Sequence, residues 1–316
     1  MAMSAVDLAA HVRKEFGKII VGQSEPLDQL LIVVLTGGHA LIEGVPGLAK
    51  TLAVKSLAHI FRLQFQRVQC TPDLIPGDIL GGNIFQPSNA TFQLHQGPVF
   101  TDLLLVDEIN RMPPRTQSAL LEAMEELQVT IDGKSYPLSR AFSVFATQNP
   151  VEFEGTYPLP EAQLDRFLMK IRVGYPDAAQ ESEILSRYQN GFEARDLEKS
   201  GLEAVSRETL QGARDEIAKV RVEPKLFDYI VAIVRGTRDS AAASLGASPR
   251  AAVAMMAAAK AYAAIEGRDF MIPDDVKSAA PPVLRHRLIL KPEADLEGIT
   301  PDQVIAQVLA GIAVPK

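Results

Sequence analysis

A glycine-containing loop at residues 44–51, with the sequence GVPGLAKT, constrains the fold of this chain more than any other feature. It follows a short apolar run, Ala40–Glu43, and opens a stretch with helical spacing, Lys50–Phe61. A loop between a strand and a helix can direct its backbone N–H groups at a chain of phosphates, and it needs glycines to do so. The spacing required for contacts to phosphate and Mg²⁺ is met by Gly44, Gly47, Lys50 and Thr51. We call residues 44–51 the phosphate loop.

The phosphate loop departs from the usual pattern at one position. Ala49 replaces the glycine that normally precedes the lysine. An alanine there keeps the anion site at the start of the helix but adds a methyl group near the phosphates. Alone, the segment would also fit an ordinary Gly/Pro-rich turn from a strand into a helix.

A second motif, LLLVDEIN at residues 103–110, favours the phosphate-binding interpretation. Its apolar run is typical of a strand buried on both faces, and it ends in two adjacent carboxylates, Asp107 and Glu108. We predict that Asp107 contributes to a Mg²⁺ site and that Glu108 polarises the attacking water. Alone, the pair would fit a cap at the end of a strand. Together with the phosphate loop on a separate strand, it indicates a P-loop ATPase.

The pattern of the chain predicts two domains. In residues 1–175, β-rich runs alternate with helical stretches, which indicates an α/β domain with a largely parallel sheet. The predicted strands are Ala40–Glu43, Gln66–Cys70, Leu103–Asp107, Ser143–Gln148 and Leu168–Val173. In residues 176–316 the strand signals stop and helical spacing continues, which predicts an all-helical domain. The predicted helices there are Asp177–Gln189, Arg207–Val220, Lys225–Arg238, Pro249–Glu266 and Pro301–Ile312.

Two segments interrupt the α/β pattern. Residues 72–98 are rich in Pro, Gly and Asn. Residues 129–138 place Asp132-Gly133 between two β-type flanks, which predicts a hairpin with a two-residue turn. Ordered loops that are extra to a core usually carry interactions. Packing against a neighbouring subunit is the alternative role for the hairpin.

Three further residues become candidates for the ATP site once the phosphate loop and the carboxylate pair are taken together. Asn149 ends the apolar run in FATQNP, where it could hold the γ-phosphate or the water, or serve only the turn. Arg166, just before the last predicted strand, fits an arginine finger that reaches the ATP of the next subunit, or a surface ion pair. Arg250 lies at the start of a predicted helix, where a bound phosphate would offset its conflict with the helix dipole.

Composition excludes several classes of protein. The formal net charge is −7, so the chain lacks the basic balance expected of a dedicated nucleic-acid binder, which leaves only a local basic patch open. The single cysteine, Cys70, excludes an intrachain disulfide. No apolar run reaches the length of about 18 residues expected of a transmembrane helix. The first residues also lack the pattern of a secretory signal. We therefore expect a cytoplasmic location.

The motifs together resemble those of the AAA+ ATPases and, within them, those of the MoxR family, which is similar to magnesium-chelatase ATPase subunits. The resemblance covers nearly the whole chain and rests on EGVPGLAKT, LLLVDEINR, FATQNP, LPEAQLDRF and SPRA, which occur in family order. Ala49 is itself a variant found in this family. The resemblance implies an α/β fold with a P-loop AAA+ core, whose parallel sheet is sandwiched by helices, followed by an all-helical lid.

The resemblance also implies a role for each motif residue. Glu108 would be the base, Asn149 sensor 1 and Arg166 the arginine finger, with Thr51 and Asp107 at Mg²⁺. Residues 21–23 resemble the segment that lines the adenine pocket, and Arg250 resembles sensor 2. The implied ATP contacts are Val21, Gly22, Gln23, Gly44, Val45, Pro46, Gly47, Leu48, Ala49, Lys50, Thr51, Leu52 and Arg250. Residues 72–98 look like the insert of helix 2, and residues 129–138 like the hairpin before sensor 1.

The implied function is that of a hexameric ring that hydrolyses ATP to remodel or activate a protein client, with a partner that carries a von Willebrand factor A domain. A motor or loader on nucleic acid is one alternative, because the same fold supports it. The acidic balance of the chain disfavours that alternative. A nucleotide switch without turnover is another, which the presence of both Glu108 and Arg166 disfavours.

Overall fold

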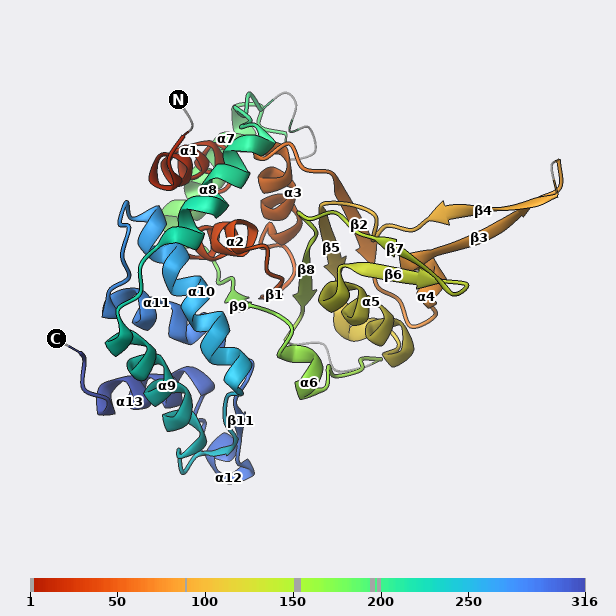
Figure 1. Ribbon diagram of the computed structural model, residues 1–316. Coiled ribbons are helices and arrows are strands. Elements are labelled where there is room, and N and C mark those ends of the chain that lie inside the picture. The colour runs from red at the N-terminus through yellow and green to blue at the C-terminus, as the bar shows by residue number, and fades with distance from the viewer. Residues whose placement is uncertain (1–2, 89, 151–154, 194–196, 198–199, 316) are drawn as a thin grey trace.

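Five parallel strands form the central sheet of the first domain, in the order β2-β5-β8-β1-β9 (Figure 1). In this computed structural model, residues 3–88, 90–150, 155–193, 197 and 200–315 are described. The strands of the sheet are β1 (Ala40–Glu43), β2 (Phe65–Gln69), β5 (Leu103–Asp107), β8 (Ser143–Gln148) and β9 (Met169–Arg172). The predicted parallel sheet is confirmed, and each strand lies within one residue of its predicted limits.

Helices cover both faces of this sheet, because successive side chains of a strand point to opposite faces. Leu103 and Leu105 pack in one core, while Leu104 and Val106 pack in another. The first core includes side chains of α1 (Ala5–Gly17), α2 (Ser24–Thr36) and α3 (Lys50–Ile60). The second includes side chains of α4 (Pro76–Leu80) and α5 (Pro114–Glu126). A strand with apolar residues on both faces therefore becomes the centre of a three-layer domain.

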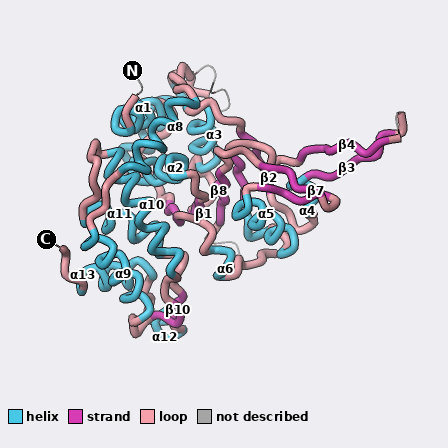
Figure 2. The backbone as a smooth tube through the Cα atoms, viewed as in Figure 1, coloured by secondary structure: helices cyan, strands magenta, loops and turns pink. Residues whose placement is uncertain are grey.

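Two antiparallel hairpins extend from the first domain. The predicted turn at Asp132-Gly133 is confirmed and joins β6 (Gln128–Ile131) to β7 (Lys134–Pro137). Both turn residues have positive φ, 49° and 78°, as a two-residue hairpin turn of type I′ requires. Residues 72–98 contain α4 and a longer hairpin, β3 (Gly81–Gln86) and β4 (Thr91–Gln96), which projects away from the body of the protein (Figure 2). Asn89 of that segment lies outside the described residues.

The second domain is a helical lid, as predicted. Its helices are α7 (Ala178–Gln189), α8 (Arg207–Lys219), α9 (Pro224–Arg238), α10 (Pro249–Ile265), α11 (Pro273–Leu284), α12 (Pro292–Leu296) and α13 (Pro301–Gly311). The lid also contains a short antiparallel ribbon, β10 (Ala243–Leu245) and β11 (Ile289–Leu290), which the sequence did not predict. Strands of two or three residues are too short to produce an alternating pattern. Within the described part of the chain, no helix is long and apolar enough to cross a membrane.

The alanine-rich helix α10 joins the lid to the first domain. Its buried alanines, which include Ala258, Ala259 and Ala261, pack in the same core as α1 and α2. Small side chains let neighbouring helices approach closely, and these alanines are buried where α10 packs against α1 and α2. Parts of the lid therefore share one core with α1, α2 and one face of the sheet.

Candidate active site

The carboxyl ends of three neighbouring strands bring the predicted site together. β8 pairs with β1 on one side and with β5 on the other. Because all three strands are parallel, the phosphate loop after β1, Asp107 and Glu108 at the end of β5, and Asn149 after β8 lie at one edge of the sheet. The sequence predicted each of these features separately, and the strand order explains why they meet.

The backbone of the phosphate loop has the conformation that its glycines allow. Gly47 has a φ of 87°, and Ala49 has a φ of 55° immediately before α3 begins at Lys50. A side chain at Gly44 would place its Cβ 2.7 Å from the carbonyl oxygen of Val173, so glycine is needed for this close approach. Lys50 Nζ donates to the carbonyls of Gly44 and, at 3.2 Å, Val45. The ammonium group therefore lies over the loop that it would serve.

A polar cluster surrounds Asp107, whose side chain is buried. Its Oδ2 accepts hydrogen bonds from Arg67 Nε at 2.7 Å and from Thr51 Oγ1 at 3.4 Å. Its Oδ1 accepts one from Thr147 Oγ1 at 3.0 Å. The same Thr147 hydroxyl accepts the backbone N–H of Glu108 at 2.9 Å. Thr147 therefore fixes both carboxylate residues from the neighbouring strand.

Glu108 lies just beyond the strand in a strained backbone conformation. Its φ is 58°, in the left-handed region that few non-glycine residues adopt, and such strain is common at active sites. Its Oε2 lies 3.2 Å from Arg111 Nε, within the following 3₁₀ turn (Ile109–Arg111). The Glu108 side chain remains partly exposed beyond the end of β5.

The oxygens near Lys50 match what Mg²⁺ requires. Mg²⁺ takes oxygen ligands in an octahedral arrangement, commonly one or two carboxylates, phosphates and waters. Thr51 Oγ1 and the Asp107 carboxylate supply two such oxygens, and they lie within 3.4 Å of each other. The cluster also contains Arg67, which forms an ion pair with Asp107 at 2.7 Å.

A cavity of about 150 Å³ lies beside the phosphate loop. From the predicted adenine segment it is lined by Val21 and Gln23, and from the loop and α3 by Gly47, Leu48, Ala49 and Leu52. The lid closes it with side chains of α7 and the turn that follows, among them Tyr188 and Phe192. Gly22 has a φ of 74°, and a Cβ there would overlap the Gln180 side chain. The cavity therefore has apolar walls suited to a flat ring next to a phosphate-binding loop.

Arg166 and Arg250 meet at a different place. Both pair with Glu125 on α5: Arg250 Nη2 donates to Oε1 at 2.5 Å, and Arg166 Nη2 forms an ion pair with Oε2 at 2.8 Å. The hydrogen bond from Arg250 lowers the pKa of Glu125 most, and the positive charge of Arg166 lowers it further. This carboxylate therefore stays ionised. The two arginine side chains remain 27% and 49% exposed, respectively. The sequence did not predict Glu125, because nothing in its local pattern points to residues of two other elements.

This arginine pair lies at the opposite edge of the sheet from the phosphate loop. Ala40, the first residue of β1, pairs with Met169, and Arg166 precedes Met169 by three residues. The phosphate loop begins only after Glu43, at the other end of β1. The cavity that Arg166 and Arg250 line also includes Gly38 and His39, just before β1, and no residue of the phosphate loop. The structure thus groups Arg250 with Arg166 and not with the other predicted ATP contacts.

Sequence reasoning missed Thr147 and Arg67 as well. Thr147 precedes Asn149 by two residues, so the alternation of a strand was a usable signal for a side chain on the same face. Arg67 lies in the polar pattern of β2, at the border of the sheet, where a charged side chain is ordinary. Only the pairing of β2 with β5 brings it to Asp107.

The comparisons with known proteins agree with this geometry. The profile described as "ATPase family associated with various cellular activities (AAA)" matches residues 39–169, and an AAA lid domain profile matches residues 235–308. Chaperone MoxR1 of Mycobacterium tuberculosis is 44% identical over 96% of this chain and 81% of its own length. YeaC of Bacillus subtilis is 43% identical, over 96% and 93%. A crystal structure from Cytophaga hutchinsonii superposes with a TM-score of 0.89 at 43% identity, covering 99% of this chain and 96% of the other.

The fold and the site define an AAA+ ATPase: a parallel α/β domain that binds nucleotide, followed by a helical lid. Within that class, the chain belongs to the MoxR family.

Proposed function

We propose that this chain assembles into a hexameric ring in which each ATP site is completed by the neighbouring copy, and that the ring remodels or activates a protein client. The observation that carries the proposal is the position of Arg166 and Arg250. They lie near the amino end of β1, whereas their own phosphate loop follows its carboxyl end. The two ends of this four-residue strand are roughly 13 Å apart. A cation placed there serves the ATP of an adjacent copy better than its own.

One half of the proposed site comes from the chain's own residues. The backbone N–H groups of the phosphate loop and Lys50 hold the phosphates of ATP, and residues 21–23 line the pocket for its adenine ring. Glu108 polarises the attacking water, and Asn149 orients the water or the γ-phosphate. Thr51 and Asp107 would hold Mg²⁺, which neutralises charge on the phosphates when bound. Thr147 keeps Asp107 and Glu108 in register.

The other half comes from the next copy. On assembly, Arg166 and Arg250 exchange Glu125 for the phosphates of the neighbour's ATP. Both guanidinium groups are already paired with an anionic oxygen and partly exposed, so the exchange replaces one charge-assisted contact with another. An arginine that stabilises the transferring phosphoryl group from outside the subunit makes turnover dependent on assembly.

Mixing two inactive variants tests this arrangement. Lys50→Ala supplies an intact Arg166 but a defective ATP site, and Arg166→Ala supplies the reverse. We expect each variant to be nearly inactive alone and the mixture to recover measurable phosphate release. A mixture that co-assembles and stays as inactive as its components would contradict the composite site.

The Lys50→Ala variant should bind ATP far more weakly than the wild type while keeping the fold. Lys50 is the one cationic side chain within the phosphate loop, and the hydrogen bonds of its ammonium group go to the loop carbonyls of Gly44 and Val45. The measurement is the shift of the melting temperature with ATP, with Lys55→Ala, an exposed position on α3, as the control. A variant still stabilised by ATP as strongly as the wild type would remove Lys50 from the phosphate site.

The two hairpins are the proposed contact with the client. The tip residue Asp132 accepts a hydrogen bond from Asn83 of β3, so the hairpins are connected. The longer one exposes Ile84, Phe85 and Phe92, and the two phenylalanine rings lie 5.3 Å apart. Apolar side chains at that exposure, on a projection outside the core, suit contact with another protein.

Removing Asp132–Ser135 should spare ATP binding and impair action on the client. The turn residues contribute little to the core, because the buried residues of this hairpin, Val129 and Ile131, lie outside the deleted segment. ATP binding by the variant, measured by melting shift, is compared with ATP turnover in the presence of client. Loss of ATP binding on trimming would mean that the hairpin has a structural role instead.

Further details of the assembly belong to the same proposal. We place the domain boundary after residue 175, between β9 and α7, and we propose a partner with a von Willebrand factor A domain. The cytoplasmic location stays a prediction. Co-purification with Glu108→Gln, which should retain ATP and any client, is the direct way to identify the protein partner. Strong stimulation of ATP hydrolysis by DNA would instead favour a nucleic-acid motor.

A further inference from the structure

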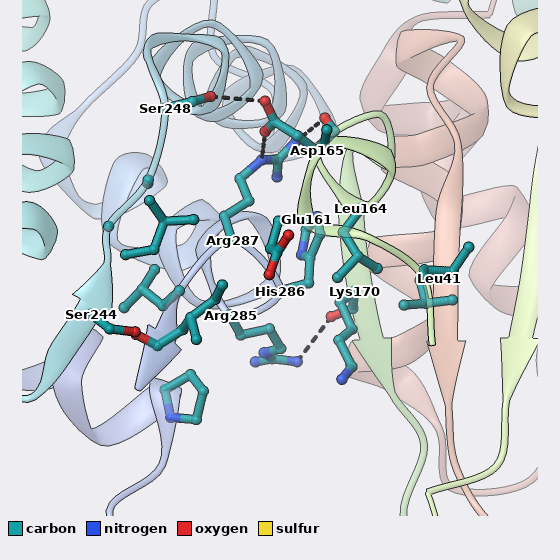
Figure 3. Close-up of a pocket in the computed structure, with 18 of the residues that line it drawn as sticks. Leu41, Glu161, Leu164, Asp165, Lys170, Ser244, Ser248, Arg285, His286 and Arg287 are labelled. Carbon is teal, nitrogen blue, oxygen red and sulfur yellow. Dashed lines mark hydrogen bonds and ion pairs between the residues drawn. The ribbon is translucent and has the colours of Figure 1, made fainter. Parts of the chain in front are cut away.

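A buried arginine of the lid holds the segment that carries Arg166. Arg287, between α11 and β11, is only 7% exposed and lies against residues 165–168 of the first domain (Figure 3). Its Nε donates to Asp165 Oδ1 at 2.6 Å, and its Nη2 donates to the carbonyls of Asp165 at 3.0 Å and Phe167 at 2.8 Å. Its Nη1 donates to the carbonyl of Leu168 at 3.2 Å. One lid side chain thus fixes the backbone on both sides of Arg166.

This arrangement is more than the pairing that a buried charge needs. A buried guanidinium must satisfy its donors, but a single carboxylate and ordinary helix carbonyls could do so. Here three of the acceptors are backbone or side-chain oxygens of the residues next to Arg166, and they come from the other domain. The fixed fork of N–H groups makes the contact directional as well as charged.

Ser248 connects the carboxylate of Asp165 to the start of α10, the helix that carries Arg250. Ser248 is the N-cap residue of α10, yet its side chain makes no capping hydrogen bond to the helix. Its hydroxyl instead donates to Asp165 Oδ2 at 2.8 Å, opposite the oxygen that Arg287 uses (Figure 3). Arg250 follows two residues later on the same helix. Asp165, the residue immediately before Arg166, is therefore held by Arg287 and also by the end of the helix that carries Arg250.

We propose that Arg287 is a positioning residue for ATP hydrolysis, which holds Arg166 and Arg250 as one rigid unit whose place is set by the lid. This inference rests on the proposed function, because the two cations act on the ATP of the neighbouring copy. Arg287 is buried, and its hydrogen bonds to the first domain go to protein oxygens of residues 165–168. It acts on the site of the next subunit through Asp165 and the backbone of residues 165–168.

The test uses the position of the substitution within a mixed ring. Arg287→Lys keeps the charge but cannot reproduce the fork of hydrogen bonds. In the first mixture, Arg287→Lys lies in the copy that supplies Arg166. The double variant Lys50→Ala/Arg287→Lys is mixed with the single variant Arg166→Ala. In the second mixture, Arg287→Lys lies in the copy that supplies the ATP site. The double variant Arg166→Ala/Arg287→Lys is mixed with the single variant Lys50→Ala. Phosphate release is measured in both after sedimentation has verified equal assembly.

We expect the first mixture to lose about 10²-fold of the recovered activity, the loss that a small misplacement of a catalytic group can cause. The second mixture should keep its activity within about twofold. Equal losses in both placements would show a purely structural role for Arg287 and overturn the inference. If Lys50→Ala and Arg166→Ala do not complement each other at all, the composite site fails first, and this inference fails with it.

Two further variants keep the test decisive if Arg287→Lys weakens folding. Ser248→Ala removes only the hydroxyl contact to Asp165, and the same asymmetry is expected on a smaller scale. Arg285→Lys is the matched control. Arg285 is a lid arginine two residues away that donates to Asp302 and to the carbonyl of Lys170 on β9, not to residues 165–168. Its effect should be equal in the two placements, and an asymmetry as large as that of Arg287→Lys would contradict the proposal.

Discussion

The Arg166→Ala variant is expected to lose about 10³–10⁵-fold in ATP turnover, the range that arginine fingers supply. That loss corresponds to about 4–7 kcal/mol of activation free energy. The stability of the subunit should change little, because the ion pair of Arg166 with Glu125 is partly exposed and such pairs contribute about 0–1 kcal/mol. Turnover and melting temperature measured on the same preparation separate the two effects.

Arg221→Ala is a suitable control for Arg166→Ala. Arg221 forms an exposed ion pair with Asp269 at 3.0 Å, far from the predicted site in the sequence. Its removal should leave turnover unchanged within about twofold. If Arg166→Ala behaved in the same way, Arg166 would be an ordinary surface ion pair and not a finger.

The Glu108→Gln variant should retain ATP binding and lose about 10²–10⁴-fold in turnover, the contribution typical of general acid–base catalysis. The amide keeps the shape of the side chain but removes the negative charge that polarises water. The backbone of Glu108, held by Thr147, depends on the main-chain N–H and is preserved. ATP binding is measured by melting shift and turnover by phosphate release.

Glu122→Gln is the matched control for Glu108→Gln, since Glu122 is an exposed carboxylate on α5. It should alter neither binding nor turnover. Hydrolysis by Glu108→Gln at nearly the wild-type rate would assign the role of base to another residue. Loss of ATP binding in that variant would mean that Glu108 contributes to the ground state and not to the chemistry.

Local chemistry made much of this site predictable from the sequence. The phosphate loop, the carboxylate pair and the hairpin turn each depend on residues a few positions apart, so their patterns survive in a single sequence. Gly44 and Gly47 are needed for backbone geometry, and Asp132-Gly133 for a turn with two positive φ angles. These requirements are set by sterics within the segment itself.

Contacts between distant segments were not predictable in the same way. Glu125, Arg166 and Arg250 come from three elements and two domains, and only the packed structure brings them together. Asp165 and Arg287 are separated by 122 residues, yet they form a direct ion pair. Helix α11 was also missed, because Pro281 and Pro282 lie inside it and proline normally ends a helix.

The most direct test of the composite site is ATP turnover per subunit measured against protein concentration, with sedimentation to determine the assembled fraction. Because Arg166 lies across the sheet from its own phosphate loop, we predict that turnover per subunit rises in proportion to assembly and is nearly absent in the dilute monomer. A verified monomer that hydrolyses ATP as fast as the assembled form would contradict the account.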